Sequence, residues 1–416
     1  MLSVEQAIAA ILGEVKPRSP IDVALNDALG LTLAVDIVSD VDSPPFAKSL
    51  MDGFAVRSGD LSGSLRTLVV IEAVTAGRVP QRTVQPGQAA RIMTGAPLPD
   101  GADAVVPVEQ CDFTEEGEGE GEREREGGTV VVRSAVRAGT YVIPRGQSMS
   151  QGEKVLHAGT RLGAPQLGLL AEVGRATVTV WPRPTVGVLA TGDELVPIEQ
   201  APGEGQIRNS NQTMLIAQVS QTAATPCPLG IARDERAHLQ SKIADGLACD
   251  VLCLSGGVSA GTLDLVPAAL QAAGIREVLH KVDMKPGKPV WFGKLDAERA
   301  PDGQPRWIFG LPGNPVSSMV CFELFVRTAL RKLMGVDPAE PQSIPARLEV
   351  DHQTRGDRPT YFPAHFRWKP DGAVVRPVDW RGSFDLRAAA DANAMIEYPA
   401  GERAYSAGKM VNVLLW

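Results

Sequence analysis

The residues best suited to chemistry begin with a glycine-rich loop after a short apolar run. Residues 251–254 are Val-Leu-Cys-Leu, and the loop Ser255–Asp264 holds three glycines, two serines and a final carboxylate. Glycines let a backbone approach an anion closely, and N–H groups at the start of a helix, expected here over 265–273, favour negative charge. This order fits a nucleotide-phosphate site, and it fits equally a tight turn in an α/β sheet.

Four other loops carry residues of the same kind. They hold a Gly-Asp-Glu sequence, an Arg-Asn-Ser-Asn sequence, two lysines around Pro-Gly, and a Pro-Gly-Asn-Pro turn, at 191–195, 205–211, 285–289 and 310–317. Lysines and backbone N–H groups neutralise phosphate, and carboxylates hold Mg²⁺, so the set fits a phosphate ester with a divalent cation. The five histidines are scattered, and no serine–base couple is visible. We therefore expect metal- and charge-assisted transfer at a phosphate, with positioning as the main contribution.

Each of these charged residues also has a purely structural interpretation. Asp193 and Glu194 are suited to cap a helix, and Lys285 and Lys288 are suited to a solvated turn. Asp234 precedes a helical pattern, where an acidic residue favours any helix N-terminus. The residues alone leave these alternatives open.

The elements that must position these loops alternate between apolar runs and helical patterns. The runs are 185–190, 251–254 and 307–310, and the helical patterns are 212–219, 235–248 and 265–273. This alternation predicts a mainly parallel sheet with helices on both faces, in which ligands bind at the carboxyl ends of the strands. Asn314 as N-cap and Pro315 as first helical residue predict a last helix that runs to about residue 333.

Outside this region the sequence predicts one helix and two β-rich parts. Apolar positions at helical spacing, with Ser3 and Gln6 as a capping box, predict an N-terminal helix. Short β-like runs over 67–136 predict a small all-β module, and the chain from Gly335 onward predicts a second β domain.

Three further segments are less regular. Residues 21–38 suggest a helical turn that leads into a strand, and 155–176 return to helical spacing. Residues 44–57 have no core pattern, and a surface loop with a turn at Asp52-Gly53 is one interpretation of them.

The composition excludes several classes of protein. The chain has 416 residues, of which 44% are hydrophobic and 22% charged, and it has neither a run of about 20 apolar residues nor a secretory signal. We therefore expect two to four domains, a cytoplasmic location and no membrane partner. The five cysteines are an odd and scattered set, which indicates a reducing compartment rather than a disulfide framework. For Cys249 and Cys253, core packing is favoured over a zinc site.

Most of the acidic excess lies in one segment. Glu115–Gly128 holds seven glutamates and two arginines, a net of −5, so the rest of the chain carries −3 of the total −8. We expect this insertion to be a solvated excursion without chemistry. No basic stripe with interleaved aromatic residues is present, so nucleic acid is not an expected partner.

Taken together, the motifs resemble the molybdopterin molybdenumtransferase family, the MoeA-type enzymes also found as the E domain of gephyrin. The resemblance runs in order from Ser3 to the C-terminus, and six motifs in register are far more specific than one. They are Met51–Ala55, Met93–Ala96, Thr191–Leu195, Ser255–Ser259, Lys285–Pro289 and Gly310–Ser317.

The resemblance implies a multidomain α/β and β fold in a homodimer, with the active site at the subunit interface. The expected domains are a linker domain (1–48 with 142–181), an inserted β module (49–141), a molybdopterin- and nucleotide-binding α/β domain (182–334) and a C-terminal β domain (335–416). The implied enzyme is a transferase of molybdenum cofactor biosynthesis. It inserts molybdenum from molybdate into adenylylated molybdopterin and releases AMP, assisted by Mg²⁺ or another divalent cation, and the molybdopterin adenylyltransferase is a candidate partner.

The resemblance also assigns residues to roles. The catalytic positions are Asp52, Thr94, Glu194, Asp234 and Asp264, with Glu194 and Asp264 as metal ligands. The substrate- and nucleotide-binding positions are Gly256, Gly257, Ser259, Lys281, Lys285, Lys288, Gly313 and Asn314. The positions expected to meet molybdate are Ser317, Arg358 and Ser383.

The chain departs from the family pattern at three places, one of which is the acidic insertion in the β module. Gln147-Ser148 stands where many members have an acidic pair, so one acidic functional position is lost, and Pro267 stands where a lysine is frequent. These departures bear on the coordination of the cation more than on the reaction.

Two other functions share parts of this sequence pattern. A molybdopterin adenylyltransferase resembles residues 185–333 alone, but it needs neither the Met51–Ala55 motif nor the C-terminal β domain. A scaffold with the same fold would have lost the acidic and basic site residues, and nearly all of them are retained.

Overall fold

The computed structural model describes residues 1–61, 66–114, 127–258, 265–300 and 302–416, which form two compact units. Unit 1 comprises residues 1–35, 158–167 and 177–416, and unit 2 comprises 36–157 and 168–176. Ser259, Asp264 and residues 115–126 of the acidic insertion lie outside the described residues. No helix in the described ranges is long and apolar enough to cross a membrane.

Unit 1 is built on a six-stranded sheet in the order β17-β14-β18-β21-β20-β19. The strands are β17 (Thr225–Ala232), β14 (Thr185–Thr191), β18 (Val251–Ser255), β21 (Arg306–Leu311), β20 (Trp291–Leu295) and β19 (Arg276–His280). The first four run parallel, and β20 and β19 extend one edge in antiparallel pairing. The mainly parallel sheet predicted from the sequence is confirmed, and burial on both faces explains the continuous apolar runs of β18 and β21.

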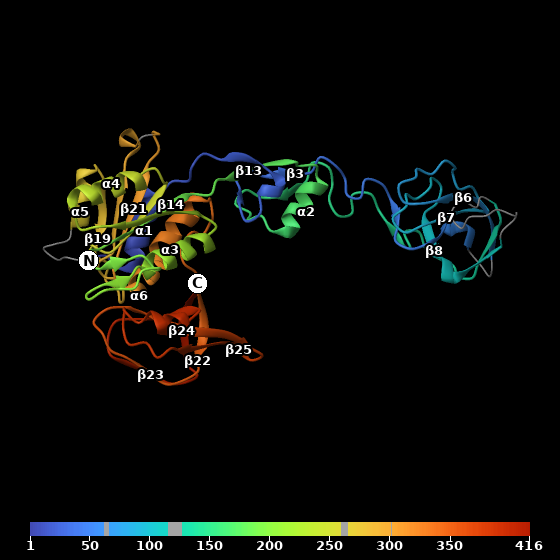
Figure 1. The fold of residues 1–416 in the computed structure, drawn as a ribbon. Helices are drawn as coiled ribbons and strands as arrows, with labels where there is room; N and C mark the ends of the chain where they lie inside the picture. The colour runs from blue at the N-terminus through green and yellow to red at the C-terminus, as the bar shows by residue number, and fades with distance from the viewer. Residues whose placement is uncertain (62–65, 115–126, 259–264, 301) are drawn as a thin grey trace. The chain divides into compact units, whose positions relative to one another are not determined.

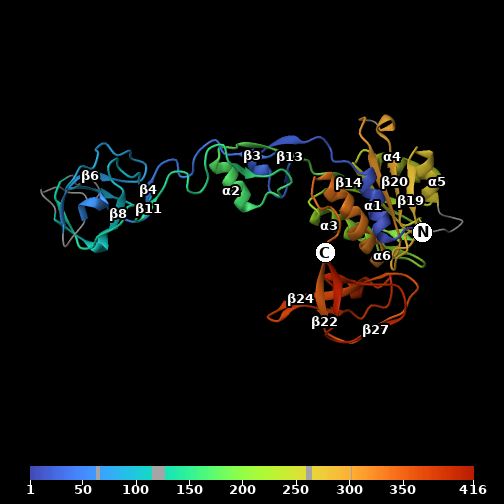
Figure 2. The same cartoon turned by 180° about the vertical axis from the view of Figure 1, so that it is seen from behind.

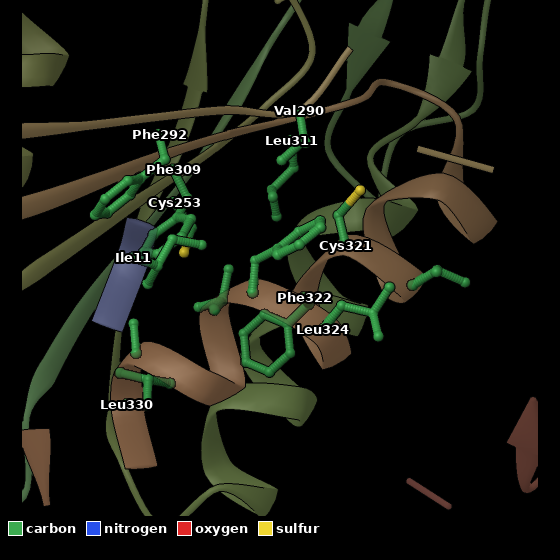
Figure 3. Packing of buried hydrophobic residues seen from close by; sticks show 14 of the residues in the cluster. Ile11, Cys253, Val290, Phe292, Phe309, Leu311, Cys321, Phe322, Leu324 and Leu330 are labelled. Atoms are coloured by element: carbon green, nitrogen blue, oxygen red, sulfur yellow. The ribbon is translucent and has the colours of Figure 1, made fainter. Parts of the chain in front are cut away.

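Helices cover both faces of this sheet. Alternate residues of β18 belong to two cores: Cys253 packs in the cluster of α1 (Val4–Glu14), α3 (Ser210–Gln221) and α7 (Arg327–Leu333), and Leu252 packs in that of α4 (Arg236–Gly246) and α5 (Leu265–Ala272). Because successive side chains of a strand point to opposite faces, these helix groups lie on opposite sides of the sheet. Figure 3 shows Cys253, Phe292 and Phe309 near Ile11 of α1 in the first core.

The N-terminal helix begins at the predicted capping box. The Ser3 hydroxyl accepts the Gln6 backbone N–H (3.2 Å), and the Gln6 side chain accepts the Ser3 backbone N–H (2.9 Å). These bonds satisfy two N–H groups that a helix start otherwise leaves unpaired.

The last helix of the α/β part differs from the single α-helix that we predict from Pro315. It consists of α6 (Pro315–Cys321), a π-helical segment (Phe322–Val326) and α7, and every residue of the π segment is buried. Apolar spacing predicts the helix but carries no signal for this local widening of the turn.

The C-terminal part of unit 1 is a closed barrel in the order β22-β25-β24-β26-β28. The strands are β22 (Ser343–Leu348), β24 (Thr360–Lys369), β25 (Gly372–Pro377), β26 (Ala394–Tyr398) and β28 (Met410–Leu415), with α8 (Leu386–Ala390) between β25 and β26. A short ribbon, β23 (His352–Thr354) with β27 (Arg403–Tyr405), accompanies them. Figures 1 and 2 both show the barrel (red) beside α6 and far from α5, and the predicted β-rich C-terminal part is confirmed.

Unit 2 contains the predicted all-β module, a six-stranded sheet in the order β8-β5-β7-β6-β10-β9. The strands are β5 (Gly53–Val56), β6 (Arg66–Val74), β7 (Gln88–Ile92), β8 (Ala104–Pro107), β9 (Cys111–Thr114) and β10 (Thr129–Val132). Unit 2 also contains two separate two-stranded sheets, β4 (Lys48–Ser49) with β11 (Val142–Ile143) and β3 (Ile37–Val38) with β12 (Lys154–Leu156). The surface-loop interpretation of residues 44–57 is wrong for its second half, because β5 is buried along its whole length between β7 and β8.

The helical turn that leads into a strand, predicted within residues 21–38, is present: Leu25–Asp27 form the turn, and β2 (Thr32–Leu33) follows it. A strand that the sequence does not predict, β1 (Ile21–Ala24), precedes the turn. β1 and β2 pair with β13 (Thr177–Trp181) on its two sides. Helical structure in 155–176 is limited to α2 (Ala164–Glu172).

Candidate functional site

Three parallel strands of unit 1 end level with one another. In the register of the sheet, Ala190 of β14 is opposite Ser255 of β18, and Ser255 is opposite Leu311 of β21. The loops that follow these residues therefore leave the same edge of the sheet, where open α/β sheets bind ligands.

Two glycines of the central loop are required by its geometry. Gly256 and Gly257 have φ angles of 100° and 66°, in the region that favours glycine. A Cβ on Gly256 would lie 2.6 Å from the Thr191 carbonyl oxygen, and one on Gly257 would lie 2.6 Å from a methyl group of Val266. The loop consequently exposes backbone rather than side chains at the strand ends.

A polar network ties these loops together. The Asn211 amide donates to the Ser255 hydroxyl (2.8 Å) and to the Gly313 carbonyl (2.7 Å). The Ser255 and Ser318 hydroxyls are 3.3 Å apart, and Ser318 donates to the Pro312 carbonyl (2.8 Å). Such a network holds the loops in one arrangement before a ligand binds.

A cleft of about 710 Å³ opens above this network. Its lining includes six of the predicted site residues, namely Glu194, Asp234, Gly256, Gly257, Gly313 and Asn314. The Asp234 backbone N–H donates to the Asp193 carboxylate (3.1 Å), which joins the loops after β14 and β17. The lining thus combines glycine backbone, two carboxylates, the Arg208 side chain and amide and hydroxyl groups, a mixture suited to a phosphate ester with a cation.

A smaller pocket of about 230 Å³ shares Asn314 with this cleft. Its lining includes two of the three predicted lysines, Lys285 and Lys288, and all three residues expected to meet molybdate, namely Ser317, Arg358 and Ser383. These residues come from the loop before β20, from α6 and from two loops of the barrel region.

The smaller pocket is strongly basic. Its lining has three cationic side chains and two hydroxyl groups. The Arg358 side chain is 26% exposed, and its guanidinium pairs with the neighbouring Asp357 (3.2 Å) and donates to the Met284 carbonyl (3.4 Å). Cations and hydroxyl donors together suit an oxyanion of charge −2.

Backbone bonds hold the two sides of this pocket together. The Lys285 N–H donates to the Pro359 carbonyl (2.8 Å), and the Tyr361 N–H donates to the Lys285 carbonyl (2.8 Å). The lysine loop of the α/β part is therefore fixed to β24 of the barrel.

Some predicted residues are not part of these two pockets. Among the described residues Lys281 lines neither of them; it lies after β19, with its N–H bonded to the Val290 carbonyl (2.9 Å). Ser259 and Asp264 fall in the range that the structure does not describe. Asp52 and Thr94 belong to unit 2.

Asp52 and Thr94 form a hydrogen-bonded pair within unit 2. One Asp52 carboxylate oxygen accepts both the backbone N–H (2.6 Å) and the hydroxyl (2.7 Å) of Thr94. These two bonds, the backbone one first, lower the pKa of Asp52 below its ordinary value. The pair thus keeps an exposed carboxylate ionised and oriented.

Removal of the Thr94 hydroxyl should raise the pKa of Asp52. In Thr94→Val we expect a partial return toward the ordinary aspartate pKa, because the backbone N–H, the larger cause, remains. A carboxyl group whose pKa is lower in the folded than in the unfolded state stabilises the fold at pH values above the unfolded-state pKa. This stabilisation is lost as the pH falls through the folded-state pKa, so the variant, in which it is smaller, should unfold more readily in acid. Titration of the Asp52 carboxyl carbon by NMR measures the shift, with Thr94→Ser as control; an unchanged pKa in Thr94→Val would contradict the pairing.

The described residues could hold a divalent cation only together with ligands from phosphate and water. They contain no group of three or more His, Cys, Asp or Glu residues placed to hold a metal ion. Glu194 and Asp234 line one cleft, and Mg²⁺ commonly binds through one or two carboxylates together with phosphates and water. Cys249 and Cys253 are buried free thiols, as predicted, and burial raises the pKa of Cys249 to about 12.

Sequence reasoning missed several lining residues. Asn211 and Ser255 lie within the motifs that we single out, so the signal was present although they are not among the predicted site residues. Phe384 lines the larger cleft with 66% of its surface exposed, and Trp380 lines the smaller pocket. The spacing of these two aromatic residues in a β-rich stretch carries no such signal, because only the packing of the barrel places them.

Comparison with known proteins identifies relatives along the whole chain. Residues 2–174 match the family model for the MoeA N-terminal region (domain I and II), 187–332 that of a probable molybdopterin binding domain, and 345–416 that of the MoeA C-terminal region (domain IV). Molybdopterin molybdenumtransferase of Staphylococcus epidermidis is 34% identical, with 100% of this chain and 95% of that protein covered. The Bacillus subtilis protein of the same name is 33% identical, with 100% and 94% covered.

Solved structures show the same fold. Two structures of the molybdopterin biosynthesis MoeA protein from Pyrococcus horikoshii superpose with TM-scores of 0.81 and 0.82 at 29% and 27% identity. They cover 100% of this chain, and 99% and 100% of their own chains. With family models matched along nearly its full length and relatives above 30% identity, the chain belongs to the MoeA family of molybdopterin molybdenumtransferases.

Proposed function

We propose that this chain inserts molybdenum from molybdate into adenylylated molybdopterin and releases AMP, as a transferase of molybdenum cofactor biosynthesis. The observation that carries the proposal is the pair of adjoining pockets, a phosphate-type cleft and a basic oxyanion pocket, which share Asn314. A reaction with an adenylylated substrate and an oxyanion needs two such places side by side.

The larger cleft is assigned to the phosphates of the adenylylated substrate. Release of AMP by hydrolysis breaks the phosphoanhydride bond: a water oxygen bonds to one phosphorus, the other phosphate leaves, and negative charge grows on the phosphate oxygens. Donors that are fixed in advance stabilise such charge at little reorganisation cost. Gly256, Gly257 and Gly313 let the substrate approach the backbone closely, and the Asn211 network keeps these loops in place.

The smaller pocket is assigned to molybdate. Lys285, Lys288 and Arg358 neutralise its charge, and Ser317 and Ser383 donate hydrogen bonds to its oxygens. Ser317 is only 5% exposed, so this side of the pocket removes the anion from bulk water. Lys281, which lines neither pocket, keeps only the role that the resemblance implies.

A divalent cation such as Mg²⁺ completes the proposal. Glu194, with Asp234 near it in the cleft and Asp264 from the family pattern, would hold it. A bound cation neutralises phosphate charge and favours the departure of AMP.

The proposed assembly is a homodimer of four-domain subunits, divided at residues 49, 142, 182 and 335 as the family resemblance implies. In this dimer the Asp52–Thr94 pair of one subunit would complete the site of the other, with Asp52 ionised and held in place by its hydrogen bonds. The molybdopterin adenylyltransferase is the proposed partner that hands over the adenylylated substrate.

Reconstitution tests the proposed function. The full chain is incubated with adenylylated molybdopterin, Mg²⁺ and molybdate, while AMP release and cofactor formation are followed together. We expect both to depend on molybdate and on the cation. Formation of adenylylated molybdopterin from ATP and molybdopterin would instead identify an adenylyltransferase, and no turnover with either substrate set would favour a scaffold.

A further inference from the structure

We propose that Asn314 is a positioning residue for the Ser383 hydroxyl, and that it acts on the oxyanion through this hydroxyl rather than by binding the nucleotide. The inference rests on the proposed function, since it takes molybdate as the ligand of the smaller pocket. The inference is drawn from one hydrogen bond, which the Asn314 side-chain amide donates to the Ser383 hydroxyl oxygen at 3.0 Å.

The side chain of Asn314 does not make the capping hydrogen bond that is usual at its position. Asn314 is the N-cap residue of α6 and precedes Pro315, as the sequence predicts, and an N-cap asparagine normally accepts a backbone N–H of the first turn. Here its side chain makes no capping hydrogen bond within the described part of the chain. It reaches instead to Ser383, in the loop between β25 and α8.

This contact decides what the Ser383 hydroxyl can do. A serine hydroxyl has one proton to donate and two lone pairs that accept. The Asn314 amide occupies one lone pair, and the same nitrogen cannot accept the serine proton. Among the described residues the hydroxyl of Ser383 donates to no other group. Its proton is therefore left for an acceptor in the pocket, and an oxyanion is such an acceptor.

A second bond holds the same residue. The Val316 backbone N–H donates to the Ser383 carbonyl (3.0 Å). The start of α6 therefore bonds to the main chain of Ser383 through Val316 and to its side chain through Asn314. The two bonds fix a loop of the barrel region on the α/β part, beside Ser317 and Arg358. The backbone bond survives any replacement of Asn314, so such a replacement changes the direction of the hydroxyl more than the place of the loop.

A double-mutant cycle on molybdate binding tests this role. Equilibrium dialysis of molybdate against the full chain compares wild type, Asn314→Ala, Ser383→Ala and the double variant. Because one such hydrogen bond is worth a factor of roughly 3 to 10, each single variant should bind molybdate weaker by about that factor. The double variant should be no weaker than Ser383→Ala alone within about twofold, because Asn314 then has nothing to position. In turnover, Asn314→Ala should raise the KM for molybdate by the same factor and change kcat much less.

Asn211→Ala is the matched control, since Asn211 bonds to Gly313 next to Asn314 but does not contact Ser383. Its effect should multiply with that of Ser383→Ala. Asn314→Ser, which keeps a capping residue but is too short to reach Ser383, replaces Asn314→Ala if the latter does not fold. Multiplying effects of Asn314 and Ser383, or weaker AMP binding with unchanged molybdate binding in Asn314→Ala, would overturn the inference. Failure of the wild-type chain to bind molybdate would instead overturn the proposed function.

Discussion

Arg358→Ala should weaken molybdate binding roughly 10- to 100-fold, because a hydrogen bond to a charged group contributes about 1.5–3 kcal/mol. Arg358 lines the smaller pocket, and its side chain is only 26% exposed, so solvent screens its charge less than that of a fully exposed arginine. Loss of the guanidinium also leaves only Lys285 and Lys288, among the side chains that line this pocket, to neutralise the anion. Equilibrium dialysis with molybdate gives the dissociation constant.

Two other variants sharpen this experiment. Arg358→Lys keeps the charge but loses the planar fork of donors, so its affinity should fall between wild type and Arg358→Ala. Arg355→Ala removes an exposed arginine three residues away that lines neither described pocket, and it should bind like wild type. If Arg358→Ala and Arg355→Ala bind molybdate equally well, the smaller pocket is not the oxyanion site.

Arg327→Met should cost about 3–5 kcal/mol of unfolding free energy, the usual loss when one partner of a buried ion pair is removed. Glu323 lies in the π-helical segment and is 5% exposed. Arg327 donates to both of its carboxylate oxygens, at 2.5 and 2.9 Å, and the Gln218 amide donates to one of them at 2.7 Å. Without Arg327 the buried Glu323 carboxylate would keep, among the described residues, one hydrogen-bond donor, the neutral Gln218 amide.

The matched control replaces both charges. Glu323→Met combined with Arg327→Met should recover most of the lost stability, because paired apolar residues often replace a buried ion pair at little cost. Urea denaturation followed by tryptophan fluorescence compares the three proteins. A single Arg327→Met variant as stable as wild type would show that solvent reaches the carboxylate, contrary to its burial.

Much of the fold was predictable because local patterns carried it. The continuous apolar runs of β14, β18 and β21 reflect strands buried on both faces, and Ser3 with Gln6 marks the start of α1 through bonds between near neighbours. The strand order, the antiparallel edge β20-β19 and the closure of the barrel depend on pairings between distant segments. A pattern within a short window cannot register such pairings.

The same distinction separates the parts of the candidate site. Residue types at the strand ends, and the glycines that allow close approach to the backbone, could be read from local sequence, because they are properties of a loop and its neighbours. The sequence also indicates the family, since six motifs stand in register along one chain.

Which of these residues meet depends on how the barrel packs against the α/β part, and local sequence does not record that packing. Arg358 and Ser383 enter the smaller pocket because the barrel packs beside α6, and Lys281 stays outside it although it is near Lys285 in sequence. The hydrogen-bond partner of the Asn314 side chain likewise depends on the tertiary structure. A local rule makes Asn314 a helix cap, but a hydroxyl 69 positions away lies within reach of its amide, and the side chain bonds there instead.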